Sequence, residues 1–367
     1  MEQNRIFGLD LMRAAAIIMV LCSHVLWIYP ESKGFLVEIF KLFGFWGVEI
    51  FFVLSGFLIG RILYRLYLKE DFTTKTMFYF LKRRWFRTLP NYYLVLLLNI
   101  VIALIIGTSL KDVVFYPFFL QNFAWTMKPF FTESWSLSVE EFAYLFLPLA
   151  FLFCSFLVRP KNKSRAFFII VFILTLLFLI FKLAYQLTTE NIDINQWNLS
   201  LKAVVIYRID SILIGVLAAW FSMVFVDIWK SKRFLFALIG LVFVGFMYVG
   251  VGFFRLLIDT HPFFWNVLYL PLTSITFSLF LPFLSEWKAE SNWLTNSITF
   301  TSKISYSIYL LHYGVVLQLM KYFISTEAFS TSMLHGFTFA YLLITFLLSF
   351  LLYRYFEKPI MDLRDRY

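Results

Sequence analysis

One apolar segment near the N-terminus carries three ionisable side chains, Asp10, Arg13 and His24. If residues 9–29 form a helix, Arg13 and His24 are about three turns apart, so they share a face and lie about 16 Å apart along its axis. Asp10 lies one turn from Arg13 on nearly the same face. A histidine among apolar residues can take a proton from a hydroxyl, and a guanidinium can bind an anion. The alternative is an Asp10–Arg13 ion pair at the helix end, with His24 hydrogen-bonded to a neighbouring helix.

Other polar side chains also interrupt apolar segments, where they are costly and therefore candidates for a functional site. Adjacent carboxylates point to different sides of a helix, so at most one of Glu140 and Glu141 is expected to face the protein interior. The further candidates are Glu49, Trp135, Arg208, Asp210, Tyr306 and His312.

The segment 61–87 is the most basic part of the chain and contains Arg84 and Arg87. We expect it to lie along the cytosolic face of a membrane, partly as an amphipathic helix. One interpretation is an anchor for lipid headgroups, and the other is a docking surface for an anionic cofactor. The two roles are compatible.

The histidines and cysteines do not have the spacing of a metal site, so no metal is predicted. The two cysteines lie in apolar runs and are interpreted as small hydrophobic residues. The residues concerned are Cys22, Cys154, His24, His261, His312 and His335.

The composition indicates which kind of element holds these candidate residues. Of the 367 residues, 61% are hydrophobic and 15% are charged. The apolar residues form runs of about twenty, the length that crosses a bilayer core. The sequence therefore predicts an all-α integral membrane protein, a bundle of about ten transmembrane helices. The predicted spans are 9–29, 39–62, 91–107, 137–158, 166–184, 203–225, 234–252, 264–284, 304–323 and 336–355.

Most of the 32 Lys and Arg residues fall at connections that lie on one side if both termini are cytosolic, as the positive-inside rule requires. The net charge of +10 is therefore interpreted as a topology signal, and nucleic acid is not expected as a partner. Residues 1–367 are expected to form one membrane domain with a retained first helix and no appended soluble domain. The connection 108–136 is itself apolar and should fold back against the helices.

Several motifs occur in an order that resembles acyltransferase family 3, the polytopic membrane O-acyltransferases that modify bacterial surface glycans. Arg13 and His24 match the family's Arg-x10-His signature, and Arg84 with Arg87 match its Arg-x-x-Arg cytosolic motif. The resemblance covers nearly the whole chain, with Met12 where Leu is usual and Lys358 where Arg is usual. The remaining matching segments are 47–58, 135–141, 208–210 with Gly215, 305–312 and 356–359.

The resemblance implies an enzyme of the bacterial inner membrane that moves an acyl group, expected to be acetyl, from cytosolic acyl-CoA to a hydroxyl. The acceptor would be a sugar in a surface glycan or glycolipid, and membrane lipids and other glycan-synthesis proteins are the further partners. Acyl-CoA would be a substrate, with no permanently bound cofactor.

For acyl transfer of this kind, His24 is predicted to be the general base, because burial favours its neutral form. Glu140 is expected to orient an imidazole or the acceptor. Arg84 and Arg87 would bind the phosphates of coenzyme A, and Arg13 would continue that path. A transporter or flippase of a glycan precursor is the alternative function, and a scaffold subunit of a glycan-synthesis complex is a third.

Overall fold

The computed structural model describes residues 5–69, 72–157, 160–190 and 193–364, which form helices and turns with no strand among them. The labels η mark 3-10 turns, except that η4 and η6–η9 are π-turns. The first half contains α1 (Phe7–Val25), η1 (Leu26–Ile28), α2 (Phe35–Lys69), α3 (Thr74–Ile106), η2 (Val113–Phe118), η3 (Thr132–Ser134), α4 (Trp135–Leu157) and α5 (Lys163–Thr188).

The second half is more broken, because π-turns interrupt several of its helices. It contains α6 (Ile194–Trp197), η4 (Asn198–Lys202), η5 (Val205–Tyr207), α7 (Ile209–Val224), α8 (Val226–Ser231), α9 (Arg233–Gly245), η6 (Phe246–Gly250), α10 (Val251–Phe253), η7 (Phe264–Tyr269), α11 (Leu270–Ser278), α12 (Leu281–Leu284), α13 (Trp293–Leu311), η8 (His312–Leu317), α14 (Gln318–Phe323), α15 (Thr331–Leu352), η9 (Tyr353–Glu357) and α16 (Lys358–Arg364).

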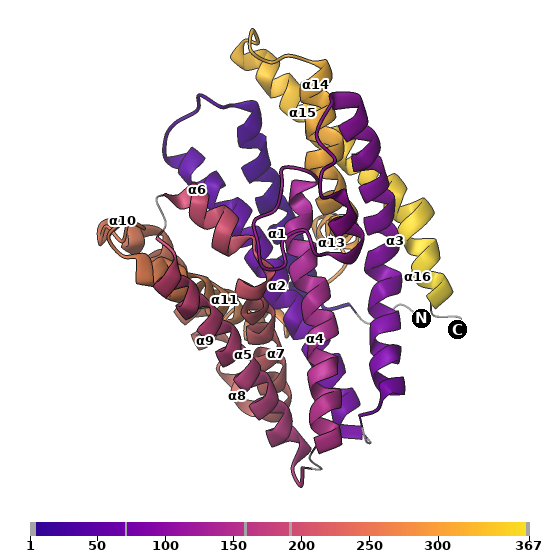
Figure 1. Ribbon diagram of the computed structural model, residues 1–367, viewed down its shortest axis with the longest axis vertical. Coiled ribbons are helices and arrows are strands. Elements are labelled where there is room, and N and C mark those ends of the chain that lie inside the picture. The colour runs from indigo at the N-terminus through magenta and orange to yellow at the C-terminus, as the bar shows by residue number, and fades with distance from the viewer. Residues whose placement is uncertain (1–4, 70–71, 158–159, 191–192, 365–367) are drawn as a thin grey trace.

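The helices form a bundle in which the lower ends of α4 and α5 lie opposite the turn between α14 and α15 (Figure 1). Among the described residues, eight helices are long and apolar enough to cross a membrane. Two predicted spans are not among these eight. The sixth becomes the shorter helix α7, and the ninth is divided among α13, η8 and α14, with the polar residues His312, Gln318 and Lys321 among its apolar ones. An all-helical membrane protein is thus confirmed, and the count of ten stays a prediction.

The basic segment 61–87 was expected to lie along the cytosolic face of a membrane, and this placement stays a prediction. Most of its described residues belong to the end of α2 and the first half of α3, a helix that begins at Thr74 although the predicted span began at residue 91. Thr73 caps α3 by accepting a hydrogen bond from the amide of Thr76 (3.4 Å), and Pro90 lies inside the helix. At 1.5 Å per residue each of these helices is about 50 Å long, which exceeds a bilayer core. Their basic ends therefore extend beyond it.

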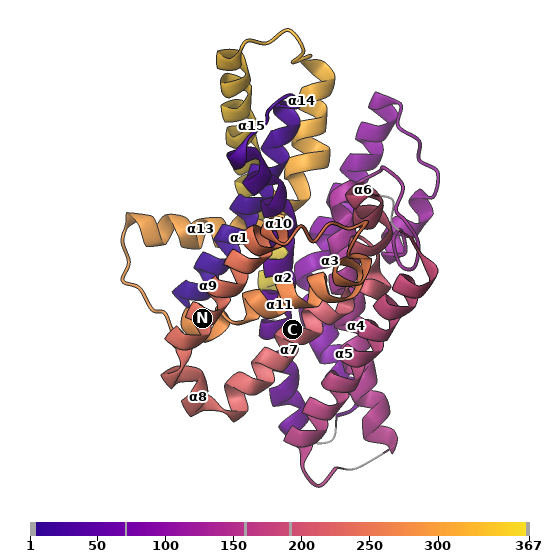
Figure 2. The same ribbon diagram turned by 90° about the vertical axis from the view of Figure 1, so that its left-hand side faces the viewer.

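The helix α2 is the centre of the bundle and packs against α1 on one side and α7 on the other. A Cβ on Gly56 would lie 2.0 Å from the carbonyl oxygen of Ile212, and a Cβ on Gly215 would lie 2.2 Å from that of Val53. The two backbones are therefore in direct contact, as small residues allow between membrane helices. Figure 2 shows α1 and α2 between α8 and α9 on the left and α3 to α5 on the right. This arrangement sets the candidate residues of α1, α2 and α3 around common spaces.

Candidate active site

A wide cavity with a basic lining lies where α1, α2 and α3 meet, at the end of the bundle that holds the N-terminal turn of α1. It encloses about 1840 Å³ of empty space including its open mouth. Most of its charged side chains are cations, and its carboxylates come from Asp10 and Glu357. We call it the basic vestibule, and its charged lining is Arg5, Asp10, Arg13, Arg61, Arg65, Arg83, Arg84, Arg87, Lys303 and Glu357.

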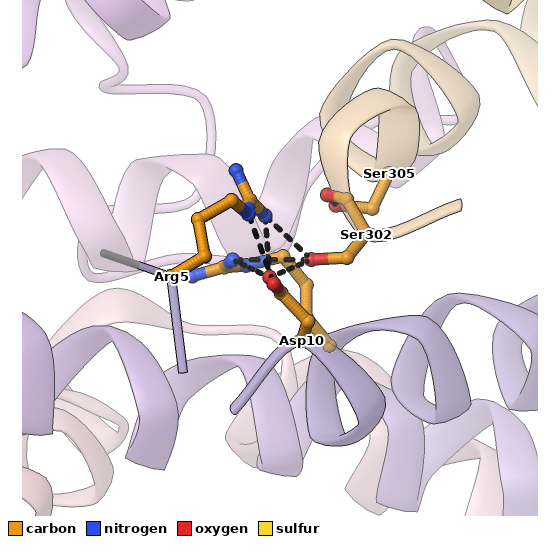
Figure 3. A network of polar contacts seen from close by, with 5 residues as sticks. Arg5, Asp10, Ser302 and Ser305 are labelled. Carbon is orange, nitrogen blue, oxygen red and sulfur yellow. Dashed lines mark hydrogen bonds and ion pairs between the residues drawn. The ribbon is translucent and has the colours of Figure 1, made fainter. Parts of the chain in front are cut away.

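The Asp10 carboxylate organises one wall of the basic vestibule. It accepts hydrogen bonds from Arg5 Nε (2.9 Å) and Ser302 Oγ (2.7 Å), and Arg13 Nη1 lies 3.6 Å away. Figure 3 shows Arg5 and Ser302 converging on this carboxylate. The Asp10–Arg13 ion pair considered as the structural alternative therefore exists. Because Asp10 is shared by two arginines, it does not compensate all their charge.

A second, narrower cavity adjoins the basic vestibule, and Arg13, Arg84 and Arg87 line both. This inner cavity has about 760 Å³ of empty space including its open mouth. The rest of its wall combines apolar and aromatic side chains with polar ones. The polar members are Ser55, Thr88, Ser136, Glu140, Tyr144, Ser305, Tyr306 and Tyr309. The three arginines predicted to bind a donor thus surround the junction of the two spaces.

Glu140 faces the inner cavity, where its Oε2 accepts a hydrogen bond from Tyr144 (2.9 Å), which also contacts Ser55 (2.5 Å). Its neighbour Glu141 accepts from Thr88 on α3 (2.7 Å) and is also buried. The expectation that at most one of the two carboxylates faces the interior is therefore wrong, because protein covers both sides of α4. Glu140 was expected to orient an imidazole or the acceptor. Its partner in the structure is Tyr144, so no imidazole contacts it here, and the role toward the acceptor stays a prediction.

The two histidines predicted separately, His24 on α1 and His312 at the start of η8, are in contact. Their ring centroids are 4.6 Å apart with the rings nearly perpendicular, and His312 Nε2 lies 3.3 Å from His24 Nδ1. His312 is fully buried, whereas His24 is half-buried. A π-turn begins at His312, and such turns are often found at functional sites. Sequence spacing does not predict this contact.

Backbone carbonyls assign the protons of this histidine pair. His312 Nδ1 is 2.8 Å from the carbonyl oxygen of Tyr309, and His24 Nδ1 is 2.9 Å from that of Val20. A carbonyl only accepts, so each neutral ring carries its proton on Nδ1. The lone pair of His312 Nε2 then faces the Nδ1–H of His24, and Nε2 of His24 is left as the basic nitrogen.

Tyr309 and Ser136 stand between the inner cavity and the histidine pair. Both line the cavity, their hydroxyls are 2.6 Å apart, and the Tyr309 ring centroid is 5.7 Å from that of His312. Tyr309 also donates to the carbonyl oxygen of Glu133 (3.0 Å). In the described part of the chain, neither histidine is among the residues that line the two cavities. Tyr309 and Ser136 therefore close the inner cavity on the side of His312.

The predicted supporting residues Glu49, Arg208 and Asp210 lie away from both cavities, in a fully buried group. Arg208 forms an ion pair with Glu49, whose other oxygen accepts from Ser274 (2.5 Å), and Asp210 pairs with Lys182 (2.5 Å). We call Glu49, Arg208, Lys182 and Asp210 the buried charge cluster. Its two cations and two carboxylates balance, and their ion pairs link α7 to α2 and to α5.

Three further buried or partly buried ionisable residues were not predicted as candidates from the sequence, namely Lys182, Lys202 and Glu133. Lys182 interrupts an apolar run, which is the signal that identified Asp210. Lys202 lies outside the spans, with its ammonium 5.7 Å from the Trp135 ring centroid and 5.9 Å from that of Phe45, and burial lowers its pKa to about 8. Glu133 Oε1 accepts from the amide of Gly314 (2.9 Å), a contact that no local pattern indicates.

Tyr306 closes another side of the inner cavity and donates to the carbonyl oxygen of Thr88 (2.9 Å). Trp135 begins α4 and packs edge-to-face on Phe52, with ring centroids 5.9 Å apart.

Within the described ranges, no three His, Cys, Asp or Glu side chains are grouped so that they could hold a metal ion.

Residues 6–354 match the family model described as an acyltransferase domain. The O-acetyltransferase OatA of Staphylococcus aureus strain NCTC 8325 is 25% identical over 388 residues, which cover 96% of this chain and 57% of that protein. A putative O-acetyltransferase of S. aureus strain COL is 25% identical over 348 residues, covering 87% of this chain and 52% of its own. The chain thus spans about half the length of these relatives, and no solved structure matches it. Because the family model matches nearly the whole chain, the protein belongs to the acyltransferase family that the motifs indicated.

Proposed function

We propose that the protein is a membrane O-acyltransferase that moves an acetyl group from cytosolic acetyl-CoA to a hydroxyl of a surface glycan or glycolipid. The observation that carries the proposal is the sequence of spaces from the basic vestibule, through the inner cavity, to the wall behind which His24 and His312 are paired. Arg84 and Arg87 bind the phosphates at the junction, and Arg13 guides the thioester arm inward. The separation of Arg13 and His24 on α1, about 16 Å, matches the reach of a pantetheine arm.

The chemistry assigned to His24 is general base catalysis. Its Nε2 takes the proton of the acceptor hydroxyl while the oxygen attacks the thioester carbonyl. The tetrahedral adduct then collapses, the carbon–sulfur bond breaks, and the coenzyme A thiolate takes the proton from His24. The ester and free coenzyme A leave, and the neutral imidazole is restored.

Replacement of His24 tests this proposal. With purified protein, acetyl-CoA and an N-acetylglucosamine oligosaccharide as acceptor, His24→Gln should fold normally but release coenzyme A at least about a hundredfold more slowly. The exposed His335, whose Nδ1 contacts Tyr29 Oη (2.8 Å), supplies the matched control, and His335→Gln should retain full turnover. Normal turnover in well-folded His24→Gln removes it from the mechanism. No coenzyme A release by the wild type, combined with glycan movement across vesicles, favours the flippase.

The side on which the donor binds is tested by topology. The distribution of Lys and Arg supports an orientation in which both termini and the basic vestibule face the cytosol. Reporters fused after Lys69, Lys163 and Arg233 should therefore all give a cytosolic signal. An external signal at either of the last two contradicts this orientation and donor binding from the cytosol.

A further inference from the structure

We propose that His312 is a positioning residue, which accepts the Nδ1–H of His24 and thereby holds Nε2 of His24 as the nitrogen that receives the acceptor's proton. The inference rests on the proposed function, in which His24 is the base. It assigns His312 no contact with substrate. Its effect passes entirely through the hydrogen bond between the two rings.

The first support is the pair of hydrogen-bond contacts that the two nitrogens of the His312 ring make. The carbonyl oxygen of Tyr309 accepts from His312 Nδ1 (2.8 Å), and His312 Nε2 faces His24 Nδ1 (3.3 Å). Because the first contact fixes the proton of His312 on Nδ1, its Nε2 has only a lone pair to offer. The nearly perpendicular rings, with an interplanar angle of 84°, direct the edge of one ring toward the other.

The second support is how His312 is held. It is fully buried, it begins the π-turn η8, and its ring is 5.7 Å from that of Tyr309 and 6.4 Å from that of Tyr313. A ring fixed in this way loses little further entropy when it holds a partner. His24 is only half-buried, so it is the ring of the pair that a substrate can approach.

The third support comes from charge. When His24 takes the acceptor's proton, its Nδ1–H becomes a stronger donor and its bond to a lone pair becomes charge-assisted. No carboxylate of the described residues forms an ion pair with either ring. His312 therefore supplies, as a neutral acceptor, the support that a carboxylate gives in other catalytic pairs.

The competing explanation is that the carbonyl oxygen of Val20, 2.9 Å from His24 Nδ1, fixes this ring without help. That carbonyl lies one turn earlier on the same helix, so it remains in every variant of His312. The two explanations differ in what happens when only the lone pair of His312 is removed. A glutamine at 312 restores a neutral acceptor near the position of Nε2, whereas an alanine does not.

The experiment compares His312→Ala, His312→Gln, His24→Gln and the double variant His24→Gln/His312→Ala, as purified protein with acetyl-CoA and the same oligosaccharide. We expect His312→Ala to lower kcat about tenfold or more with KM for acetyl-CoA unchanged, and His312→Gln to recover most of the loss. The double variant should be no slower than His24→Gln alone, because the two residues act as a unit. Melting temperatures identify any variant that fails to fold, and His312→Gln retains most of the buried volume.

Each other outcome has a definite meaning. If His24→Gln is inactive but folded His312→Gln and His312→Ala both turn over normally, Val20 suffices and this inference is wrong while the proposed function stands. If both His312 variants are as inactive as His24→Gln, His312 itself handles the proton and positioning is overturned. If His24→Gln is fully active, His24 is not the base and this inference falls with that role, while acetyl transfer itself stands.

Discussion

The basic vestibule and the buried charge cluster are both rich in arginine and lysine, but their charges are arranged in opposite ways. In the cluster, each cation has a carboxylate partner, and all four side chains are fully buried. In the vestibule, cations outnumber carboxylates, the space is open, and Asp10 is shared by two arginines.

This difference separates structural charge from charge available to a ligand. Two opposite charges in a dry interior offset part of the cost of removing them from water, and the pair carries no net charge to attract a ligand. Several like charges around an open space repel one another until an anion binds. The same residue type is therefore expected to support folding in one region and donor binding in the other.

The largest effect is expected from breaking the buried charge cluster. Arg208→Ala leaves Glu49 as an uncompensated buried charge, which should cost about 3–5 kcal/mol of folding free energy. The variant should melt at a much lower temperature or fail to accumulate, as measured by thermal unfolding in detergent.

The double variant Glu49→Gln/Arg208→Met is the control for this prediction, because it removes both charges together. It should recover a large part of the lost stability. If Arg208→Ala melts like the wild type but loses donor binding, the cluster is a binding site and the comparison between the two regions does not hold.

Removing arginines of the basic vestibule should lower the affinity for acetyl-CoA and leave the folding stability unchanged. Arg84→Ala and Arg87→Ala each remove a charge-assisted contact to phosphate, which is expected to cost about 1.5–3 kcal/mol, or roughly ten- to a hundredfold in acetyl-CoA affinity. Binding titration with purified protein measures this loss.

Lys82 on the same helix provides the matched control, since it is exposed and lies outside the basic vestibule, on a groove with Phe86. Lys82→Ala should bind the donor normally. Equal behaviour of the Lys82 and Arg84 variants indicates a general lipid-headgroup anchor in place of a donor site.

The smallest effect is expected from salt. Raising the salt from about 0.1 M to 1 M shortens the screening length from about 10 Å to 3 Å, which weakens attraction in an open basic space more than inside a buried pair. The KM for acetyl-CoA should rise several-fold while the melting temperature hardly changes. The double variant Arg84→Ala/Arg87→Ala should show a weaker salt response, and an equal response in both proteins contradicts the donor site.

Sequence alone predicted the features that depend on local periodicity. The apolar runs located most helices, and the spacing of Arg13 and His24 placed them on one helix that is continuous in the structure. The start of α3 was not predicted. The predicted span began at residue 91, after Pro90 and the charged residues, whereas α3 tolerates the proline and begins at Thr74.

The parts that sequence did not predict are contacts between distant segments. His24 meets His312 across 288 positions, and Asp210 meets Lys182 from a different helix. Hydrophobic spacing identifies which side of a helix faces inward but not which helix lies opposite it. The rule that buried charges are paired would have indicated that Asp210 needs a cation, without naming Lys182.

The layer that Tyr309 and Ser136 form between the inner cavity and the histidine pair has an electrical consequence. A continuous aqueous path from one face of the membrane to the other would conduct ions, and a potential of about 100 mV drives each charge with about 2.3 kcal/mol. The hydroxyls of Ser136 and Tyr309, 2.6 Å apart, and the Tyr309 ring close the inner cavity on the side of His312, so ions that enter it from the basic vestibule meet side chains there.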